Sequence, residues 1–255
     1  MAEDVLKLAM EGSVAVLTIN RAAKRNSMND ALLGAFERFF SDPPKDARCV
    51  ILHGDGGHYC AGLDLSEHVA RDAEGTMRHS RWWHSVMEKI QFSGLPVVSA
   101  MTGAVIGGGL ELATSTHVRI AEPSVIFQLP EGRRGIFVGG GATARVGRIL
   151  GPDRMTEMTL TGRKYGAEDG VRLGLAHYAV GEGEALAKAR ELAASIAGNA
   201  QLSNYVMIHA LARIGDMGHA DGLFTESLCA ALTQTSPDAE EGLRAFLEKR
   251  SPRFR

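Results

Sequence analysis

The chain has 255 residues, of which 45% are hydrophobic, and carries a formal net charge of −2 with a pI near 6.5. This composition suffices for a sizeable buried core and argues against global disorder, and the charge gives no electrostatic footprint for binding nucleic acid. No apolar run reaches the roughly 18–20 residues that span a bilayer, and the N-terminus lacks the basic and apolar regions of a signal peptide. The odd, scattered Cys49, Cys60 and Cys229 do not suggest a disulfide framework. We therefore expect a cytoplasmic protein of one large domain, or one domain with a small appendage.

Strands alternate with helices in the first two thirds of the sequence. A helix is predicted from Asn29 or Asp30 to the prolines at 43–44, a short one from Asp64, and a longer one over 76–92. Further helices are expected after the glycines at 139–141 and from Pro152 to Gly162. Short β-branched or apolar runs predict strands at 13–19, 48–53, 97–101, 117–121, 125–127 and 176–180. This alternation predicts an α/β fold with a parallel or mixed sheet.

The last quarter of the chain is expected to be almost entirely helical. Residues 184–248 contain only brief breaks, at 198–199, 215, 218 and 237. Such a region is either a subdomain or an arm that packs on a neighbouring subunit.

A glycine-rich stretch, 103–113, is the strongest candidate for a site. Gly107, Gly108 and Gly109 stand where a helix begins, so free backbone N–H groups and the positive end of a helix dipole face whatever lies in front. Glu111 follows in the first turn, which places a carboxylate beside a position that favours a developing oxyanion. The alternative is a tight helix start packed against a neighbour, with Glu111 at the surface.

A second glycine-bearing loop, 54–62, also follows an apolar strand. Loops after parallel strands emerge at the same end of the sheet, where ligands bind. The loops 54–62 and 103–109 could each offer one N–H to a single oxygen, with Glu111 and Glu131 as paired carboxylates nearby. Two N–H donors and two carboxylates indicate enolate chemistry at a carbonyl compound.

Other chemistries find less support. The side chains of 53, 55, 58, 60 and 64 could suggest a metal, but their spacing matches no common zinc pattern, and no metal is expected. The sequence has no P-loop, nucleophile elbow, zinc-protease helix or dinucleotide fingerprint. Trp82 and Trp83 could line an acyl pocket or belong to the core. Arg133 and Arg134 could bind a phosphate or form a solvated basic pair.

Several motifs together resemble the enoyl-CoA hydratase/isomerase (crotonase) superfamily. The resemblance covers nearly the whole chain and rests on five segments, 16–21 with Asn26, 60–65, 103–113, 129–131 and 246–249. It implies a crotonase-like spiral of β-β-α units over 1–198, which carries the active site, and a C-terminal helical trimerisation region over 199–255. It also implies a homotrimer or a dimer of trimers.

The resemblance further implies an acyl-CoA thioester as substrate, so that coenzyme A enters with the substrate and no separate cofactor is needed. The backbone N–H groups of Leu63 and Gly108 would form the oxyanion hole, with Glu111 and Glu131 as the catalytic carboxylates. Retention of both glutamates favours hydration of a trans-2-enoyl-CoA. The positions that match coenzyme A contacts of the family are Lys24, Arg25, Ala61, Asp64, Phe246 and Lys249.

Three alternatives stay open on the same scaffold: an enoyl-CoA isomerase, a specialised hydratase or dehydratase of the carnitinyl-CoA type, and a non-catalytic acyl-CoA-binding protein. Ala22, Arg134 and Val138 depart from the commonest hydratase pattern. These departures leave the identity of the acyl group open.

Overall fold

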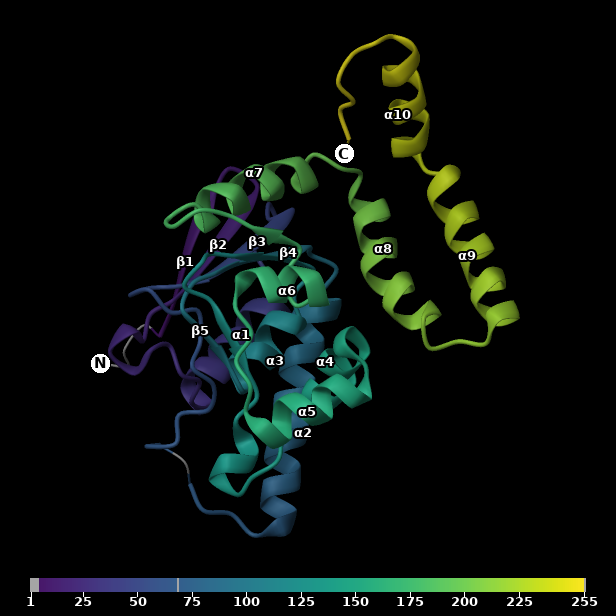
Figure 1. Cartoon of the computed structure of the whole chain (residues 1–255). Coiled ribbons are helices and arrows are strands. Elements are labelled where there is room, and N and C mark those ends of the chain that lie inside the picture. The colour runs from purple at the N-terminus through teal and green to yellow at the C-terminus, as the bar shows by residue number, and fades with distance from the viewer. Residues whose placement is uncertain (1–4, 68, 255) are drawn as a thin grey trace.

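The computed structural model describes residues 5–67 and 69–254 and centres on a six-stranded sheet (Figure 1). The strands lie in the order β1-β2-β3-β4-β6-β8; β1 pairs antiparallel with β2, and the remaining pairs are parallel. Their bounds are Leu6–Glu11, Val14–Ile19, Cys49–Gly54, Val97–Met101, Val118–Ala121 and Tyr178–Ala179. A second, two-stranded parallel sheet pairs β5 (Ala104–Ile106) with β7 (Ile126–Gln128). The mixed sheet predicted from the sequence is confirmed.

One face of the large sheet is covered by helix α7 (Ala185–Ala197) (Figure 1). Its contact stripe consists of alanines four residues apart, which lets the helix pack closely on the β-branched residues of the strands. The buried alanines are Ala185, Ala189, Ala193 and Ala197.

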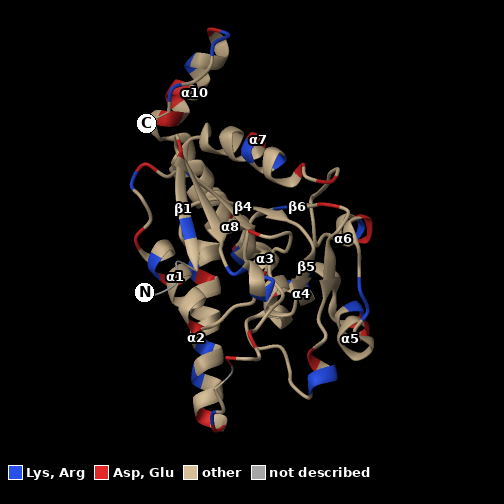
Figure 2. Ribbon diagram, turned by 90° about the vertical axis from the view of Figure 1, so that its left-hand side faces the viewer, with Lys and Arg blue, Asp and Glu red and all other residues tan. Residues whose placement is uncertain are grey.

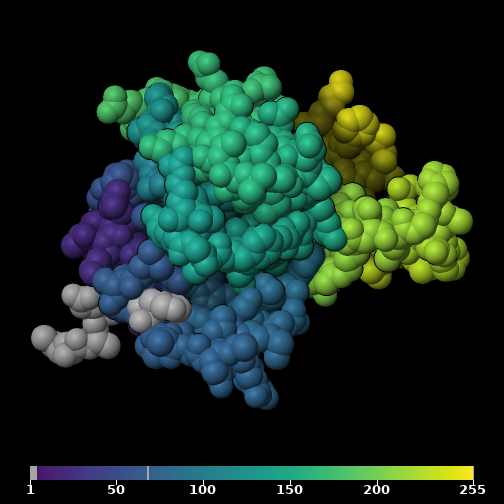
Figure 3. Space-filling model, turned by 60° about the horizontal axis from the view of Figure 1, so that its bottom comes forward, coloured from purple at the N-terminus to yellow at the C-terminus, as the bar shows by residue number. Residues whose placement is uncertain are grey.

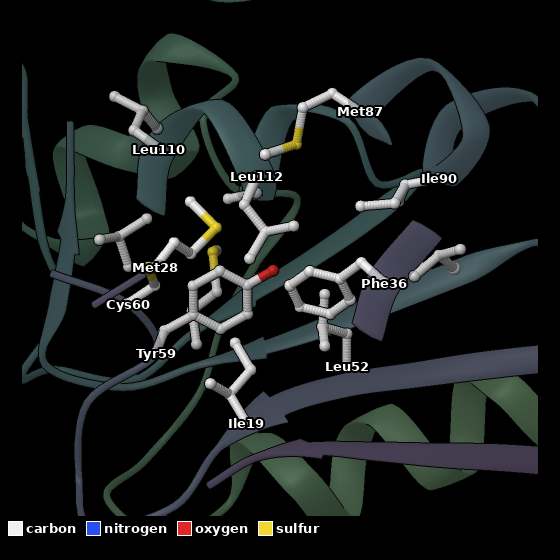
Figure 4. Packing of buried hydrophobic residues seen from close by; sticks show 14 of the residues in the cluster. Ile19, Met28, Phe36, Leu52, Tyr59, Cys60, Met87, Ile90, Leu110 and Leu112 are labelled. Atoms are coloured by element: carbon white, nitrogen blue, oxygen red, sulfur yellow. The ribbon is translucent and has the colours of Figure 1, made fainter. Parts of the chain in front are cut away.

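The opposite face holds the larger core, against helices α1 (Asp30–Ser41), α2 (Ala73–Phe92) and α3 (Gly108–Thr114). Alternate strand residues reach it; Leu17 and Leu52 pack here, whereas Val16 and Ile51 face α7. Figure 4 shows this packing, with Met28, Phe36 and Tyr59 between the sheet and the helices. The core holds α3 against the sheet and thereby fixes the position of its N-terminus.

The remaining helices extend the body and then leave it. Short helices η1 (Ala22–Lys24), η2 (Glu131–Arg134), α4 (Ala142–Leu150), α5 (Pro152–Thr161) and α6 (Ala167–Leu173) complete the body. Helices α8 (Gln201–Ile214), α9 (His219–Gln234) and α10 (Pro237–Leu247) project to one side of it (Figures 1 and 3). The proposed division at 198/199 falls between α7 and α8 and stays a prediction.

The projecting helices expose large apolar side chains, among them Leu211, Phe224 and Leu243, each more than 60% exposed. Basic and acidic residues are interspersed along the chain (Figure 2). Over the part of the chain that the structure describes, no helix combines the length and apolar character needed to cross a membrane.

Several local predictions need correction. The structure adds β1, β5 and α6, which the sequence patterns did not indicate, and the strand expected at 176–180 is limited to Tyr178–Ala179. The short helix expected from Asp64 is wrong. The Asp64 carboxylate accepts hydrogen bonds from the N–H and the hydroxyl of Ser66, at 3.0 and 2.6 Å, and so holds a turn that competes with helix formation.

The buried Asn26 ties two loops together. Its Oδ1 accepts from the N–H of Arg21 (2.9 Å), and its Nδ2 donates to the carbonyls of Asp55 (2.8 Å) and His58 (2.6 Å). Its backbone lies in the left-handed region, with φ of 57°, which asparagine tolerates better than most residues. The loop that ends β2 is thus fastened to the loop that follows β3.

Replacing Asn26 by Ala is expected to lower the free energy of unfolding by on the order of 2–4 kcal/mol, because it leaves the buried N–H of Arg21 and two part-buried carbonyls unpaired. Urea denaturation at fixed protein concentration measures the change. Asn29→Ala, which removes the side-chain cap of α1, serves as the comparison and should cost about 1 kcal/mol. A loss for Asn26→Ala no larger than that for Asn29→Ala would contradict the role given to Asn26.

Candidate active site

Helix α3 begins directly against the loop that follows β3. Gly107 is its N-cap, with φ of 54°, and Gly108 its first residue. A Cβ on Gly109 would collide with the backbone carbonyl of Cys60. A Cβ on Gly62, whose φ is 94°, would lie 2.7 Å from the carbonyl oxygen of Ile106 and 3.3 Å from the nitrogen of Gly108. The two loops therefore approach backbone to backbone, which only glycine permits at these positions.

The N–H groups of Leu63 and Gly108 are left unpaired at this approach. The backbone of Met28 is hydrogen bonded to the two neighbours of Leu63. The Met28 N–H donates to the Gly62 carbonyl (2.7 Å), and the Met28 carbonyl accepts from the Asp64 N–H (2.8 Å). Within residues 5–67 and 69–254, the backbone N–H groups of Leu63 and Gly108 have no hydrogen-bond acceptor. These are the two donors predicted from the sequence, and the structure brings them to one pocket.

The pocket has a volume of about 220 Å³. Its inner end is formed by the α3 start and the 61–63 loop, and its outer wall by α2 and the segment after Glu131. The lining includes both predicted catalytic glutamates and the side chain of Trp83. It therefore combines two backbone donors, two carboxylates and apolar surface.

Glu111 is buried at 3% exposure and held in one orientation. Its Oε1 accepts from the backbone N–H groups of Gly140 (2.8 Å) and Ala142 (3.1 Å), at the start of α4. Burial raises the pKa of Glu111, and these two hydrogen bonds oppose the increase because they favour the charged form. A Cβ on Gly140 would collide with Glu111 Oε2 and approach the Trp83 ring, so this glycine lets the carboxylate fit.

Glu131 faces the same pocket with a free oxygen. A Cβ on Gly107 would lie 2.6 Å from its Oε1, and its Oε2 is buried without a hydrogen-bond partner among the residues described. Burial raises the pKa of Glu131 to about 7; the charge of Glu111 adds to the increase, while the Glu131 N–H and Arg134 oppose it. Near neutral pH this carboxyl can therefore hold or release a proton, as a general acid or base must.

The predicted coenzyme A contacts lie in different parts of the molecule. Ala61 lines the pocket, and its N–H donates to the carbonyl of Arg25 (3.0 Å). Lys24 and Arg25 lie exposed on and just after η1, with Lys24 Nζ donating to the Ser66 hydroxyl (2.8 Å). These residues form one continuous surface beside the inner end of the pocket.

Asp64 is buried and already occupied. Burial alone would raise its pKa, but hydrogen bonds from Ser66 and from the Arg21 guanidinium (3.0 Å) outweigh that effect and lower it to about 2. Arg21 also pairs with Glu67 (2.6 Å). The side chain of Asp64 thus serves to fix the loop that carries Leu63.

Phe246 and Lys249 lie at the other end of the molecule. Phe246 is the penultimate residue of α10 and is 80% exposed, and Lys249 follows that helix. Figure 1 shows α10 far from α2 and α3. Within one chain the structure does not bring these two residues to the pocket.

The histidines near the second loop have structural roles. His53 hydrogen bonds the Thr18 hydroxyl (2.9 Å), and His58 Nδ1 accepts from the Ala104 N–H (3.1 Å). Across the chain outside residues 1–4, 68 and 255, no group of three or more His, Cys, Asp or Glu side chains could hold a metal ion.

Some functional contacts had no clear signal in the sequence. The Gly140 and Ala142 N–H groups that orient Glu111 are backbone donors, and only the glycine run at 139–141 marked their loop. Trp83 lines the pocket at 5% exposure, whereas the neighbouring Trp82 donates its Nε1–H to Glu37 (2.9 Å) on α1. From the sequence, each tryptophan could line the pocket or belong to the core.

Comparisons with known proteins agree with this geometry. A family model described as enoyl-CoA hydratase/isomerase matches residues 9–255. The enoyl-CoA hydratase EchA19 of Mycobacterium tuberculosis is 30% identical over 250 residues, covering 95% of this chain and 93% of the relative. A solved candidate enoyl-CoA hydratase from Rhodopseudomonas palustris CGA009 is 45% identical, with a TM-score of 0.94 over 96% of this chain and 95% of the other. The enoyl-CoA hydratase structure from Bacillus anthracis is 30% identical, with a TM-score of 0.92 and 98% of each chain covered.

These matches confirm the crotonase-type fold expected from the motifs, and the chain belongs to the enoyl-CoA hydratase/isomerase family.

Proposed function

We propose that the protein hydrates a trans-2-enoyl-CoA thioester to the 3-hydroxyacyl-CoA, in a reversible reaction. The observation that supports this most strongly is the pair Glu111 and Glu131, both facing one pocket that also holds the unpaired N–H groups of Leu63 and Gly108. Shifting a double bond needs only one proton-transferring group, whereas adding water needs one carboxylate for the water and one for the carbon.

The backbone donors act on the thioester oxygen. Hydrogen bonds from Leu63 and Gly108 polarise the conjugated carbonyl, which makes Cβ electrophilic and stabilises the enolate that forms on attack. The donors are rigid because neighbouring backbone groups are hydrogen bonded on both sides. Little reorganisation is therefore needed when charge develops on the oxygen.

The two glutamates differ in a way that assigns their roles. Burial raises the pKa of both glutamates, but Glu111 has two backbone N–H groups on one oxygen that favour its charged form, so we assign it as the base that takes a proton from water as the oxygen attacks Cβ. Glu131 lacks such donors on Oε2 and has its pKa raised to about 7 by burial, so it delivers a proton to Cα of the enolate. Glu111 gains one proton from water and Glu131 gives one to the product, so the two glutamates together hold the same number of protons before and after the reaction.

Three further features belong to this proposal. Coenzyme A enters as part of the substrate, with no separate cofactor, and lies along Lys24, Arg25 and Ala61. The exposed apolar side chains of α8–α10 support assembly as a homotrimer or a dimer of trimers, in which Phe246 and Lys249 could reach the coenzyme of a neighbouring subunit. The working compartment is the cytoplasm.

Replacing Glu131 by Gln is expected to lower kcat for crotonyl-CoA hydration by about 10²–10⁴-fold, the range of general acid catalysis, because the amide cannot deliver the proton. Loss of conjugated-thioester absorbance measures the rate, and product mass distinguishes hydration from isomerisation, which adds no water. Glu168→Gln changes an exposed glutamate on α6 and should match the parent. A fully active Glu131→Gln would refute the assigned role.

The pH dependence should follow the shared proton. Hydration takes up no net proton. The two glutamates must share one proton for hydration and for the reverse reaction, dehydration. We expect kcat/KM to fall as pH rises through about 7, the value to which burial raises the pKa of Glu131, because above it the pair has no proton to give. Hydration of crotonyl-CoA and dehydration of 3-hydroxybutyryl-CoA should show the same midpoint, and a rate that increases across this range would exclude the scheme.

A Cβ at Gly109 should separate the two oxyanion donors. In Gly109→Ala the methyl group meets the Cys60 carbonyl, so the start of α3 must move away from the 61–63 loop. Loss of one donor typically costs a factor of about 10²–10³ in kcat, and we expect a decrease of that order in the crotonyl-CoA assay. Gly166→Ala, where a Cβ meets nothing within 4 Å, is the matched control. Parent-like activity in a folded Gly109→Ala would show that this contact does not set the donor geometry.

A further inference from the structure

The outer wall of the pocket is where the acyl chain beyond Cβ must lie. The carbonyl end is fixed by Leu63 and Gly108, and the Lys24–Arg25 surface lies beside the same inner end. The rest of the lining comes from the N-terminal half of α2 and from residues 134–140. These two segments are joined where the Ser80 hydroxyl donates to the Gly139 carbonyl (2.6 Å).

One residue of this wall is a cation without a partner. Arg134 lines the pocket at its exposed side, and among the residues described it has neither a hydrogen-bond acceptor nor an ion pair, so its guanidinium is open to a ligand. Glu131 is the first residue of the 3-10 helix η2 and Arg134 the last, and residues three apart in such a helix lie on the same side, so the two side chains are neighbours. The adjacent Arg133 is different, because its Nη2 donates to the carbonyl of Thr161 and it does not line the pocket.

Trp83 supplies an apolar part of the same wall. Trp83 is 5% exposed and its Nε1–H has no acceptor among the described residues. The six-membered ring of the indole packs against the backbone; a Cβ on Gly108 or Gly140 would lie 3.0 or 3.1 Å from its carbons. The N–H belongs to the other ring, on the side away from these glycines. Because Gly108 and Gly140 themselves line the pocket, the wall presents the apolar six-membered ring of the indole to a ligand, and the N–H lies on the far edge.

We propose that the acyl group of the substrate carries a carboxylate beyond Cβ, with Arg134 as its charged partner. This inference rests on the proposed function, since it names the class of acyl-CoA that the same site selects. A guanidinium recognises a carboxylate through paired N–H donors that a terminal methyl group cannot use. An apolar acyl chain would leave the Arg134 guanidinium to water.

Saturated acyl-CoA thioesters test this without turnover. Isothermal titration compares pairs with equal carbon number that end in a carboxylate or a methyl group: glutaryl-CoA with pentanoyl-CoA, adipyl-CoA with hexanoyl-CoA, and suberyl-CoA with octanoyl-CoA. In at least one pair the carboxylate member should bind the parent protein tenfold or more tightly. Arg134→Gln should abolish that preference, Arg134→Lys should restore part of it, and Arg133→Gln, which removes the same charge one residue away, should keep it.

Two results would overturn the inference. One is that no pair favours the carboxylate in the parent protein. The other is that Arg134→Gln weakens both members of a pair equally, as a contact with coenzyme A would require. A separate hydration assay tests the proposed reaction itself, with crotonyl-CoA and with a trans-2-enoyl-CoA that ends in a carboxylate and has the preferred chain length. A binding preference with turnover of neither would refute the reaction and leave the acyl class standing.

Discussion

The site depends on one close approach of two backbones, where Gly109 lies on the Cys60 carbonyl. The contact is held by strand-like pairing, because the Cys60 N–H donates to the Ala104 carbonyl (2.9 Å) and its carbonyl accepts from the Ile106 N–H (3.1 Å). The segment 60–63 thus starts beside β5 and turns away from it at Gly62. The unpaired N–H groups of Leu63 and Gly108 are left at the pocket that both residues line. Because the spacing of the donors is set by main-chain hydrogen bonds, side-chain variation around the pocket can change specificity while the oxyanion site is retained.

The small sheet also brings the second glutamate to the site. β7 pairs with β5, and the pairing continues beyond the strands where the Gly107 N–H donates to the Gln128 carbonyl (2.8 Å). Glu131 therefore lies against the N-cap of the helix that carries Glu111. Burial raises the pKa of both carboxyls, and for Glu131 the charge of Glu111 adds to the increase. The large core beneath α3, with Phe36, Tyr59 and Leu110 fully buried, supplies stability that offsets the cost of burying them.

The sequence predicted those parts of the molecule that depend on local pattern. The strands of the large sheet other than β1, the long helices and the glycine start of α3 follow from apolar periodicity and turn residues, and the motifs added the pairing of Leu63 with Gly108. β5 is only three residues long and lies inside the glycine stretch, so no periodicity could indicate it. The helix expected from Asp64 was wrong because the Asp64 carboxylate binds the N–H and the hydroxyl of Ser66, a local turn that the residue pattern did not separate from a helix start. The wall that holds Arg134 and Trp83 depends on contacts between distant segments, which a single sequence does not contain.

Among the described residues, two that line the pocket contain buried atoms that the fold leaves without a hydrogen-bond partner. In the described part of the chain, three buried side-chain atoms lack a hydrogen-bond partner, and two of them, Glu131 Oε2 and Trp83 Nε1, belong to residues that line this pocket. Folding tolerates such atoms only where the rest of the core compensates for them. The two atoms belong to η2 and α2, and neither is open to solvent. The burial that leaves Glu131 Oε2 without a partner also raises the pKa of this carboxyl to about 7, so the cost of the unsatisfied oxygen and the acid–base character of Glu131 have one cause.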